Sequence, residues 1–441
     1  MQLDQYGAVA AASAIARGEI SSEQLVQACL DRIRAVEPAV LAWQHLDEAH
    51  ALTQARARDL DRAEGRSIGP LHGVPIGIKD IIDTADMPTE DGTILHAGRT
   101  PDGDATVVAS LRAAGAVIMG KTVTTEFASM HPGKTRNPHD AKRTPGGSSS
   151  GSAAAVAARM VPLALGTQTN GSVIRPAAFC GVFGFKPTHG LIPRHGIMRL
   201  SRTLDTVGMF ARSIEDIALL AEQLVGYDER DPDTRPRART PFSSVAGSEP
   251  PLAPTIAWVK TPVWDRAEDT TKEAFAELAD ALVIHCVEFD PSVAIPEAWD
   301  WHRTIAEAEM AANLDLEWEK GRDQLSDSMR HQLERGRAVT ALEYQKALAR
   351  VALLNQGFEE TFARFDAILT PAATGAAPIG DTTGDPAFCT LWSLCGMPSV
   401  NLPLMTTPEG MPLGAQLVAA RGMDARLLRT ARWLQSYVAS P

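Results

Sequence analysis

The chain has 441 residues, and its 44% hydrophobic content is enough to build a substantial core. Acidic residues outnumber basic ones by 54 to 42, and the formal charge of −12 argues against a surface that binds nucleic acid through its phosphates. The five cysteines are widely spread and form no CxxC pair, which argues against a disulfide framework or a zinc site. No stretch is long and apolar enough to span a bilayer, and the alanine-rich stretch at residues 8–16 makes a poor secretory signal. We therefore expect a soluble protein of the reducing cytoplasm, with no nucleic-acid or membrane partner.

The first part of the chain alternates between helical and strand patterns. Ser21 and Gln24 form a capping box, and apolar residues at helical spacing follow from Leu25 to Val36. Two short apolar runs then alternate with two helical stretches: the runs cover residues 74–78 and 116–119, and the helical stretches cover 106–114 and 151–159. This alternation predicts an α/β sheet with helices on its faces.

The second part of the chain predicts a helical region between two simpler segments. Residues 228–254 are rich in Pro, Asp, Arg and Ser and lack apolar periodicity, which indicates a surface connection. Residues 297–364 carry a dense helical pattern, residues 367–371 a strand, and residues 424–438 a final helix. We expect one large α/β domain over residues 1–441, with a central mixed β-sheet flanked by helices on both faces.

Two serines and one lysine carry the most informative chemistry. Ser148 lies in the run Gly146–Ser152, Ser172 follows 24 residues later (172 − 148), and Lys79 ends an apolar run upstream. A serine hydroxyl attacks a carbonyl only when a neighbouring base takes its proton. Lysine becomes such a base when burial lowers its pKa from about 10.4 toward about 7 or 8. The glycines allow successive backbone N–H groups to point at one oxyanion, so the pattern predicts a hydrolase.

With these residues and several ordered blocks, the chain resembles the amidase signature family. The blocks are Leu71–Pro75, Gly115–Thr122, Thr125–Ala128, Phe183–Thr188, Leu204–Gly208 and Leu413–Val418. The resemblance implies a catalytic core at residues 60–220 and an activity like that of bacterial amidases, aryl acylamidases and urethanases. It places the family's base on Lys79, its bridging serine, held by a cis peptide bond, on Ser148, and its nucleophile on Ser172. It places the oxyanion donors on the backbone N–H groups of Thr169, Asn170, Gly171 and Ser172.

The nucleophile segment departs from the family pattern. Relatives commonly have Asp-x-Gly-Gly-Ser-Ile-Arg, whereas this chain has Gln168-Thr169-Asn170-Gly171-Ser172-Val173-Ile174-Arg175. The Asp and the Arg of the family pattern are both missing at their usual places. If these two residues form an ion pair in relatives, the loss of both avoids leaving one charge buried alone. Asn170 replaces a glycine, and asparagine tolerates a positive φ better than most residues, so we expect the loop to survive. Arg175 is open to two interpretations, as a group that orients substrate or as a structural ion-pair partner.

Two other motifs predict different chemistry. Residues Gly115–Thr122 match the phosphate-loop pattern, but the four middle positions are themselves an apolar strand, whereas a phosphate loop follows its strand. Residues Gly147–Gly151 match GxSxG, which would make Ser149 a nucleophile. That elbow needs a strand just before it, and residues 137–145 are a polar loop. The histidines, including His131, show no metal-ligand spacing, and we expect no metal site.

The resemblance implies a proton relay that needs neither a metal nor an organic cofactor. Neutral Lys79 takes a proton from Ser148, which takes one from Ser172 as its oxygen attacks the carbonyl of an amide or carbamate. The relay then protonates the leaving nitrogen, and water hydrolyses the acyl-enzyme.

We expect the substrate wall to come from residues 125–136, 297–364 and 390–398, with the helices of 297–364 as a cap. The candidate substrate-binding residues are Met130, His131, Trp299, Trp301, Met310 and Trp392. Their apolar character predicts a substrate with an apolar or aromatic acyl or leaving group, aryl carbamates included. We expect the protein to be a monomer or a homodimer. One alternative is the glutaminase subunit of a transfer-RNA amidotransferase, with a charged pocket and partner chains, or an allophanate-type hydrolase. Another is an inactive binding scaffold, which the three filled catalytic positions disfavour.

Overall fold

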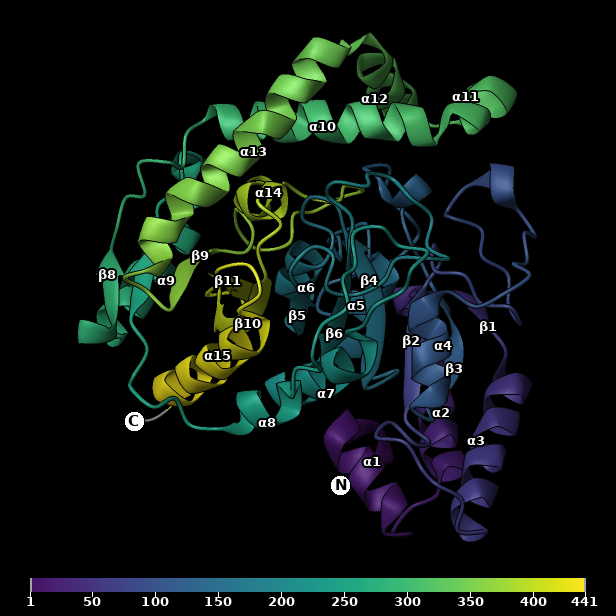
Figure 1. The fold of residues 1–441 in the computed structure, drawn as a ribbon. Coiled ribbons are helices and arrows are strands. Elements are labelled where there is room, and N and C mark those ends of the chain that lie inside the picture. Colours follow the sequence, from purple (N-terminus) through teal and green to yellow (C-terminus); the bar gives the residue numbers. More distant parts are fainter. Residues whose placement is uncertain (1, 440–441) are drawn as a thin grey trace.

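A mixed β-sheet of 11 strands runs through the protein in a computed structural model that describes residues 2–439 (Figure 1). Across the sheet, the order is β1 (Trp43–Leu46), β3 (Val117–Thr122), β2 (Pro75–Lys79), β4 (Leu163–Gln168), β6 (Thr206–Ala211), β5 (Phe183–Lys186), β10 (Ser399–Thr406), β11 (Pro412–Val418), β9 (Ala367–Pro371), β7 (Ile256–Trp258) and β8 (Cys286–Glu288). β2 lies between β3 and β4 and is parallel to both, so the carboxyl ends of these three strands meet at one edge of the sheet. From β4 to β9 the neighbouring strands are antiparallel.

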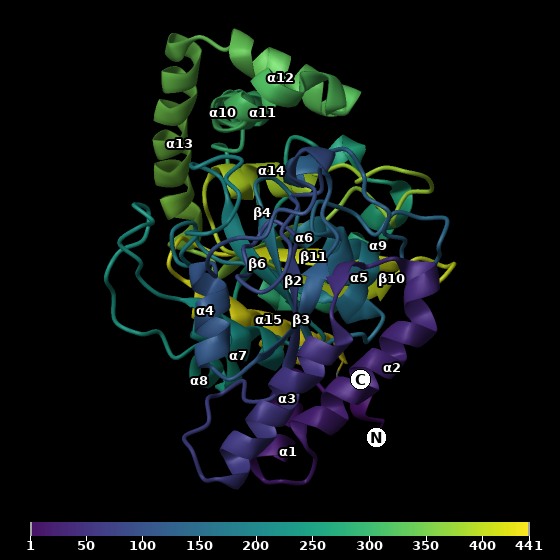
Figure 2. The same cartoon turned by 90° about the vertical axis from the view of Figure 1, so that its right-hand side faces the viewer.

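Helices cover both faces of the sheet, which is why β2, β3 and β4 are buried at every position (Figure 2). One face carries α5 (Ser150–Ala157) and α6 (Ile174–Cys180), and the other carries α4 (Thr106–Ala113), α7 (Ile214–Leu224), α8 (Phe242–Gly247) and α15 (Asp424–Ala439). The remaining α-helices of the body are α1 (Ala8–Ala16), α2 (Ser22–Val40), α3 (Glu48–Ala63), α9 (Asp269–Ala281) and α14 (Ala387–Leu394). Short 3-10 helices occur at Leu3–Gln5, Ile94–His96, Glu126–Ala128, Trp264–Arg266, Val283–His285 and Arg322–Gln324.

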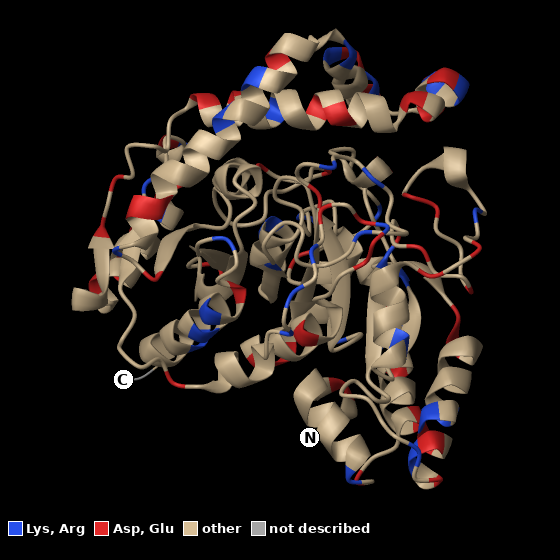
Figure 3. Cartoon of the chain, viewed as in Figure 1, with Lys and Arg blue, Asp and Glu red and all other residues tan. Residues whose placement is uncertain are grey.

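Four helices form a cap over the edge of the sheet where β2 and β4 end (Figure 1). They are α10 (Glu297–Asn313), α11 (Asp315–Gly321), α12 (Asp327–Ala338) and α13 (Ala341–Phe362). Buried Met310, Leu314, Met329 and Leu333 pack in one cluster with Phe127 of the body. This cluster helps to hold the cap to the body, as does a second cluster in which Ile305 and Phe358 pack with Trp392. Acidic and basic residues both occur along the cap helices, with other residues between them (Figure 3).

The expected α/β class and the mixed sheet between two helical layers are confirmed. The capping box of Ser21 and Gln24 is present, and the strand expected at residues 367–371 is β9. The connection at 228–254 differs from the expectation because it contains α8. Phe242 and Ala246 are buried, and α8 packs against α7 and α15. Two apolar residues are too few to form a recognisable helical period, so the sequence did not predict this helix. Within residues 2–439, no helix combines the length and apolar character that crossing a membrane requires.

The cap depends on a close approach between α10 and α12 at Gly336. A Cβ at this position would lie 1.9 Å from the Glu307 carbonyl oxygen, so Gly336→Ala must push the two helices apart. We expect it to lower the free energy of unfolding by about 1–3 kcal/mol, the usual cost of overpacking. The measurement is equilibrium denaturation, with hydrogen exchange to locate the loss in the cap. Gly247→Ala, which would meet nothing within 4 Å, is the matched control. Equal stability of the two variants would contradict the tight α10–α12 contact.

Candidate active site

Lys79 is the last residue of β2 and is completely buried. Because β2 and β4 are parallel with Ile78 opposite Leu165, the Lys79 side chain lies beside the end of β4. Its Nζ donates hydrogen bonds to Ser148 Oγ at 2.7 Å and to Thr167 Oγ1 at 2.8 Å. Burial lowers the pKa of Lys79 to about 7, against the opposing effect of the Asp205 carboxylate. An amine with this pKa accepts protons near neutral pH.

Ser148 lies in a tightly held glycine-rich loop just before α5. The peptide bond between Gly147 and Ser148 is cis. Next to it, Ser149 Oγ donates to the Thr167 carbonyl at 3.1 Å and accepts from the Thr167 N–H at 3.2 Å. These bonds need Gly166 on β4, where a Cβ would lie 2.6 Å from Ser149 Oγ. The Ser149 hydroxyl is thus engaged with backbone, and the loop before it has no strand, which disagrees with the GxSxG interpretation.

Ser172 lies in the loop between β4 and α6 and borders a cavity. Its hydroxyl makes no hydrogen bond within residues 2–439, and neither do the backbone N–H groups of Asn170, Gly171 and Ser172. Successive free N–H groups of this kind suit an anionic oxygen. The structure therefore brings Lys79 and Ser148 into direct contact, and leaves the Ser148–Ser172 hydrogen bond unmade. Catalytic hydrogen bonds often tighten only when substrate binds.

Gln168 organises the Ser172 loop, a role that was not expected from the sequence. The side chain is completely buried, and its Oε1 accepts from the N–H groups of Val173 at 2.8 Å and Ile174 at 3.0 Å. Its Nε2 donates to Ser393 Oγ at 3.0 Å, and Ser393 Oγ donates to the Asn170 carbonyl. A neutral amide thus stands where the family pattern has an acid. The glutamine in that position was the available signal.

Asn170 does not behave as expected, because its φ is not among the positive values of the chain. Its side-chain Oδ1 instead accepts a hydrogen bond from Thr390 Oγ1 at 2.9 Å. On the other side of the loop, Thr169 Oγ1 donates to Asp205 at 2.6 Å, and its carbonyl lies 3.2 Å from His302 Nε2. Burial lowers the pKa of His302 to about 4, so the imidazole is neutral and donates through Nε2. Contacts from α14, the body and the cap fix the loop.

A cavity of about 350 Å³ opens in front of Ser172, between the body and the cap. Three of the predicted substrate residues line it: Met130, Trp299 and Met310. It also has a polar lining that the sequence did not predict, with Arg175, Arg266, His302, Arg303, Glu307, Gln332, Arg335 and Asp385. Within this lining, Arg335 pairs with Glu307 and Arg266 pairs with Asp385. The wall is mixed, so the expectation of an apolar wall is wrong.

The other three predicted substrate residues do not line this cavity. Trp392 is completely buried in the core, with its ring centroid 5.4 Å from that of Phe358. Trp301 packs in the same core cluster and lies below the guanidinium of Arg350. His131 is exposed and lies outside the lining. Trp301 fails for a geometric reason, because positions two apart on a helix point to different sides, and Trp299 already faces the cavity.

The missed lining residues follow a helical period that the sequence does contain. Trp299, Arg303, Ala306 and Met310 recur at intervals of three or four along α10, and all of them face the cavity. Residues spaced in this way share one face of a helix. The prediction chose mainly aromatic residues of this region instead of one face of the helix, and it therefore missed Arg303.

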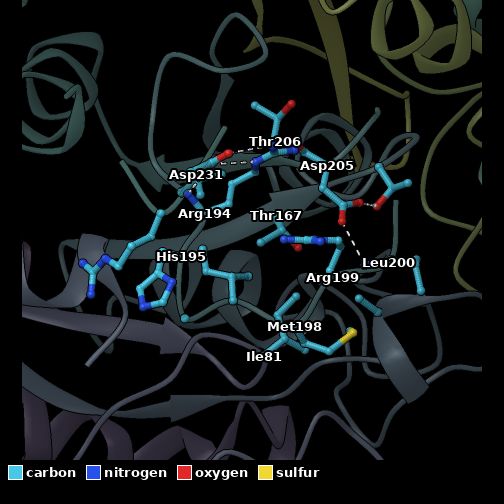
Figure 4. A pocket seen from close by; sticks show the side chains of 16 residues that line it. Ile81, Thr167, Arg194, His195, Met198, Arg199, Leu200, Asp205, Thr206 and Asp231 are labelled. Carbon is cyan, nitrogen blue, oxygen red and sulfur yellow. Dashed lines mark hydrogen bonds and ion pairs between the residues drawn. The ribbon is translucent and has the colours of Figure 1, made fainter. Parts of the chain in front are cut away.

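A second cavity, of about 150 Å³, lies beside Thr167, the second acceptor of the Lys79 amine (Figure 4). Ile81 and Met198 form part of its apolar wall, and Arg199 points into it. Half-buried Asp205 borders it and accepts hydrogen bonds from the N–H groups of Leu200 and Ser201, at 2.9 and 2.8 Å. Thr169 and Leu200 border both cavities, so the loop that carries Ser172 separates them.

The phosphate-loop pattern at Gly115–Thr122 does not form a phosphate site. Residues Val117–Thr122 are strand β3, and each of them is buried. Lys121 lies 3.5 Å from the carboxylate of Asp80 and donates to Thr89 Oγ1. The lysine that would have reached a phosphate is therefore part of a buried ion pair, as the strand-like middle positions indicated.

Comparisons with known proteins agree with this geometry. The Amidase family model matches residues 24–428. The chain belongs to the amidase family. It is 36% identical to the A subunit of glutamyl-tRNA(Gln) amidotransferase from Chloroflexus aurantiacus, over 97% of this chain and 96% of that protein. The peptide amidase from Stenotrophomonas maltophilia is similar with a TM-score of 0.86 and 30% identity, covering 99% of this chain and 97% of that one. The 6-aminohexanoate cyclic dimer hydrolase is similar with a TM-score of 0.88 and 26% identity, covering 100% and 98%.

Membership of the amidase family confirms the resemblance seen in the sequence and makes the chain a hydrolase of carbon–nitrogen bonds. The family match covers the sheet, both helical layers and the cap. Specificity for carbamates or aryl amides depends on the lining of the cavity, which is mixed.

The titration of Lys79 leads to a testable pH dependence. The amine can accept a proton only when it is neutral, so the rate of Ser172 sulfonylation by phenylmethylsulfonyl fluoride should rise as the pH passes through about 7. Asp205→Asn removes the carboxylate that raises the pKa of Lys79, so the rise should move to lower pH. Asp216→Asn alters another buried carboxyl, on α7, and should leave the profile in place. A profile that is flat between pH 5 and 9, read by intact mass, would contradict the assignment.

Proposed function

We propose that the chain hydrolyses a small amide through an acyl-enzyme on Ser172, with Ser148 and Lys79 as the proton relay. The observation that carries this proposal is the completely buried Lys79 amine, 2.7 Å from Ser148 Oγ, with a pKa near 7. A buried, largely neutral amine in contact with a serine hydroxyl can act as the base that a serine nucleophile needs. Near it, Ser172 and three free backbone N–H groups border a cavity of about 350 Å³.

The proposed reaction has two halves, each of which moves a proton along the same path. In the first, Lys79 accepts the proton of Ser148 while Ser148 accepts that of Ser172, whose oxygen forms a bond to the carbonyl carbon. The N–H groups of residues 170–172 hold the oxyanion. The carbon–nitrogen bond then breaks as the relay returns the proton to the leaving nitrogen, which avoids expelling an amide anion. In the second half, water gives a proton to the relay as its oxygen bonds to the acyl carbon. The ester bond to Ser172 Oγ then breaks, the relay returns the proton to Ser172, and the carboxylic acid leaves.

For the substrate, the lining of the cavity supports a polar group rather than a purely apolar one. Four arginines and two carboxylates surround the Ser172 side, beside Trp299 and two methionines: the arginines are Arg175, Arg266, Arg303 and Arg335, and the carboxylates are Glu307 and Asp385. Arg266 and Arg335 pair with Asp385 and Glu307 in the lining, whereas Arg303 pairs with the exposed Asp300 outside it, so Arg303 is the cation that favours an amide with a carboxylate or another acceptor group. An aryl amide or aryl carbamate, the substrate that the sequence predicted, would use Trp299 and the methionines and would leave the arginines unused.

A second candidate is the glutaminase reaction of an amidotransferase A subunit. The names of curated relatives favour it, and so does a lining that offers both charges to an α-amino acid. On this proposal the substrate is glutamine, the product is ammonia, and a partner chain receives that ammonia. The departure at Gln168 weighs against close functional equivalence, because the loop around Ser172 is organised differently from the family pattern.

The deciding experiment measures product release by the purified chain alone. Glutamine, a carboxylated aliphatic amide, 4-nitroacetanilide and a matching 4-nitrophenyl carbamate are the substrates, with ammonia or chromophore as readout. We expect turnover of the carboxylated amide, and its loss by at least about 10³-fold in Ser172→Ala and Lys79→Met. Turnover of glutamine only with a partner chain would favour the second candidate.

The matched control is Lys186→Met. Lys186 is also completely buried, with its pKa lowered by burial to about 7, but among residues 2–439 its amine bonds only the carbonyls of Pro187 and Met397. It should keep its activity if correctly folded. Equal loss in both lysine variants would refute a specific role for Lys79. No turnover of any substrate, with Ser172 unreactive toward phenylmethylsulfonyl fluoride, would favour the inactive scaffold.

A further inference from the structure

Arg175 is a buried cation without a counter-ion, three residues after Ser172. Only 5% of the residue is exposed, and no carboxylate within residues 2–439 lies within ion-pair distance of its guanidinium. Its Nε donates to the Thr383 carbonyl at 2.6 Å, and its Nη2 to the Gly147 carbonyl at 2.9 Å. Its Nη1 has no hydrogen-bond partner in the described part of the chain. The missing counter-ion disagrees with the interpretation of Arg175 as an ion-pair partner. Arg175 borders the cavity, but its unpartnered Nη1 is buried and faces the Ser172 loop rather than the open space.

The unpaired nitrogen lies directly behind the Ser172 loop. A Cβ on Gly171 would be 2.9 Å from Arg175 Nη1, so the guanidinium packs against the backbone of that residue. The backbone N–H of Arg175 also donates to the Gly171 carbonyl at 3.0 Å. Gly171 supplies one of the free N–H groups beside Ser172. The positive charge therefore lies next to the loop that faces any negative oxygen formed there.

Among the described residues, no carboxylate in contact with the guanidinium cancels this charge. The position where the family pattern has an acid is occupied by neutral Gln168, whose amide is used within the loop and on α14. The Asp385 carboxylate favours the charged form of Arg175 from a distance, but it is paired with Arg266. Leaving a buried charge unpaired is costly, and native proteins seldom leave a buried polar atom unsatisfied without a reason. In a site that largely excludes water, a fixed charge acts more strongly than it would in solution.

We propose that Arg175 is an electrostatic positioning residue, which stabilises the negative oxygen formed at residues 170–172 without touching it. This proposal rests on the proposed function of Ser172. The charge acts on the transition state, where the oxygen is anionic, and only weakly on a neutral amide in the ground state. The bonds from Arg175 to Gly147 and Thr383 fix the guanidinium in place, so little reorganisation is needed when the charge develops.

The test compares an anionic with a neutral ligand of the same site. Phenylboronic acid becomes a tetrahedral anion when it bonds to Ser172, whereas benzamide stays neutral. Dissociation constants are read as protection of Ser172 from phenylmethylsulfonyl fluoride, followed by intact mass. In Arg175→Met, phenylboronic acid should bind about 10²-fold more weakly, comparable to the loss of one oxyanion donor, while benzamide binding is little changed. Arg175→Lys keeps the positive charge and loses the forked hydrogen bonds. In this variant phenylboronic acid should bind with most of its wild-type affinity, while benzamide binding is again little changed.

The control is Arg212→Met. Arg212 also donates to backbone carbonyls, those of Tyr6 and Val161, but lies away from Ser172, and its variant should leave both dissociation constants unchanged. Equal weakening of both ligands in Arg175→Met would show a merely structural anchor and overturn the proposal, as would no weakening of either. A wild-type Ser172 that the sulfonyl fluoride does not label would overturn the proposed function, and this inference with it.

Discussion

The burial of one amine sets the conditions for the rest of the site. Lys79 ends a strand that has parallel neighbours on both sides and helices on both faces, so no water competes for its nitrogen. In such a place the charged form is disfavoured, and the amine lies within hydrogen-bond distance of two hydroxyls, Ser148 at 2.7 Å and Thr167 at 2.8 Å. A lysine on an edge strand would be solvated and protonated. The proposed chemistry therefore depends on the position of β2 as an interior strand, between β3 and β4, and only secondarily on the identity of its neighbours.

The second constraint is the shape of the backbone around Ser172. Free N–H groups point at a common region only if the loop is held from outside, because the loop itself makes few internal hydrogen bonds. Gln168 holds it from the strand, Ser393 and Thr390 from α14, and His302 from the cap. The cap therefore does more than cover the cavity, since it also contacts the carbonyl of Thr169. This links the position of α10 to the geometry of the loop.

The architecture and the reacting residues could be predicted because their signals are local. A capping box, apolar runs and a lysine at a strand end are each visible within a few residues, and the structure brings Lys79 and Ser148 together as the family resemblance implied. The lining of the cavity could not be predicted in the same way, because it joins the cap to loops that are distant in the sequence. Trp299 and Trp301 look equivalent in the sequence, and only the rotation of α10 separates them. Gln168 was recognised as a departure, but its partners in the fold could not be inferred from it.

Sheet and cap divide the work in a way that explains the variety of the relatives. The sheet edge supplies an amine, two hydroxyls and an anion-binding loop, which act on the one bond that all amides share. The face of α10 and its partners on α12 border the cavity with Trp299, Arg303 and the Glu307–Arg335 pair, which are the groups that a substrate would meet there on the proposed function. Because fold does not determine function, a change of a few residues on this face can redirect the same chemistry. The charged face of α10 therefore carries more information about the substrate than the catalytic residues do.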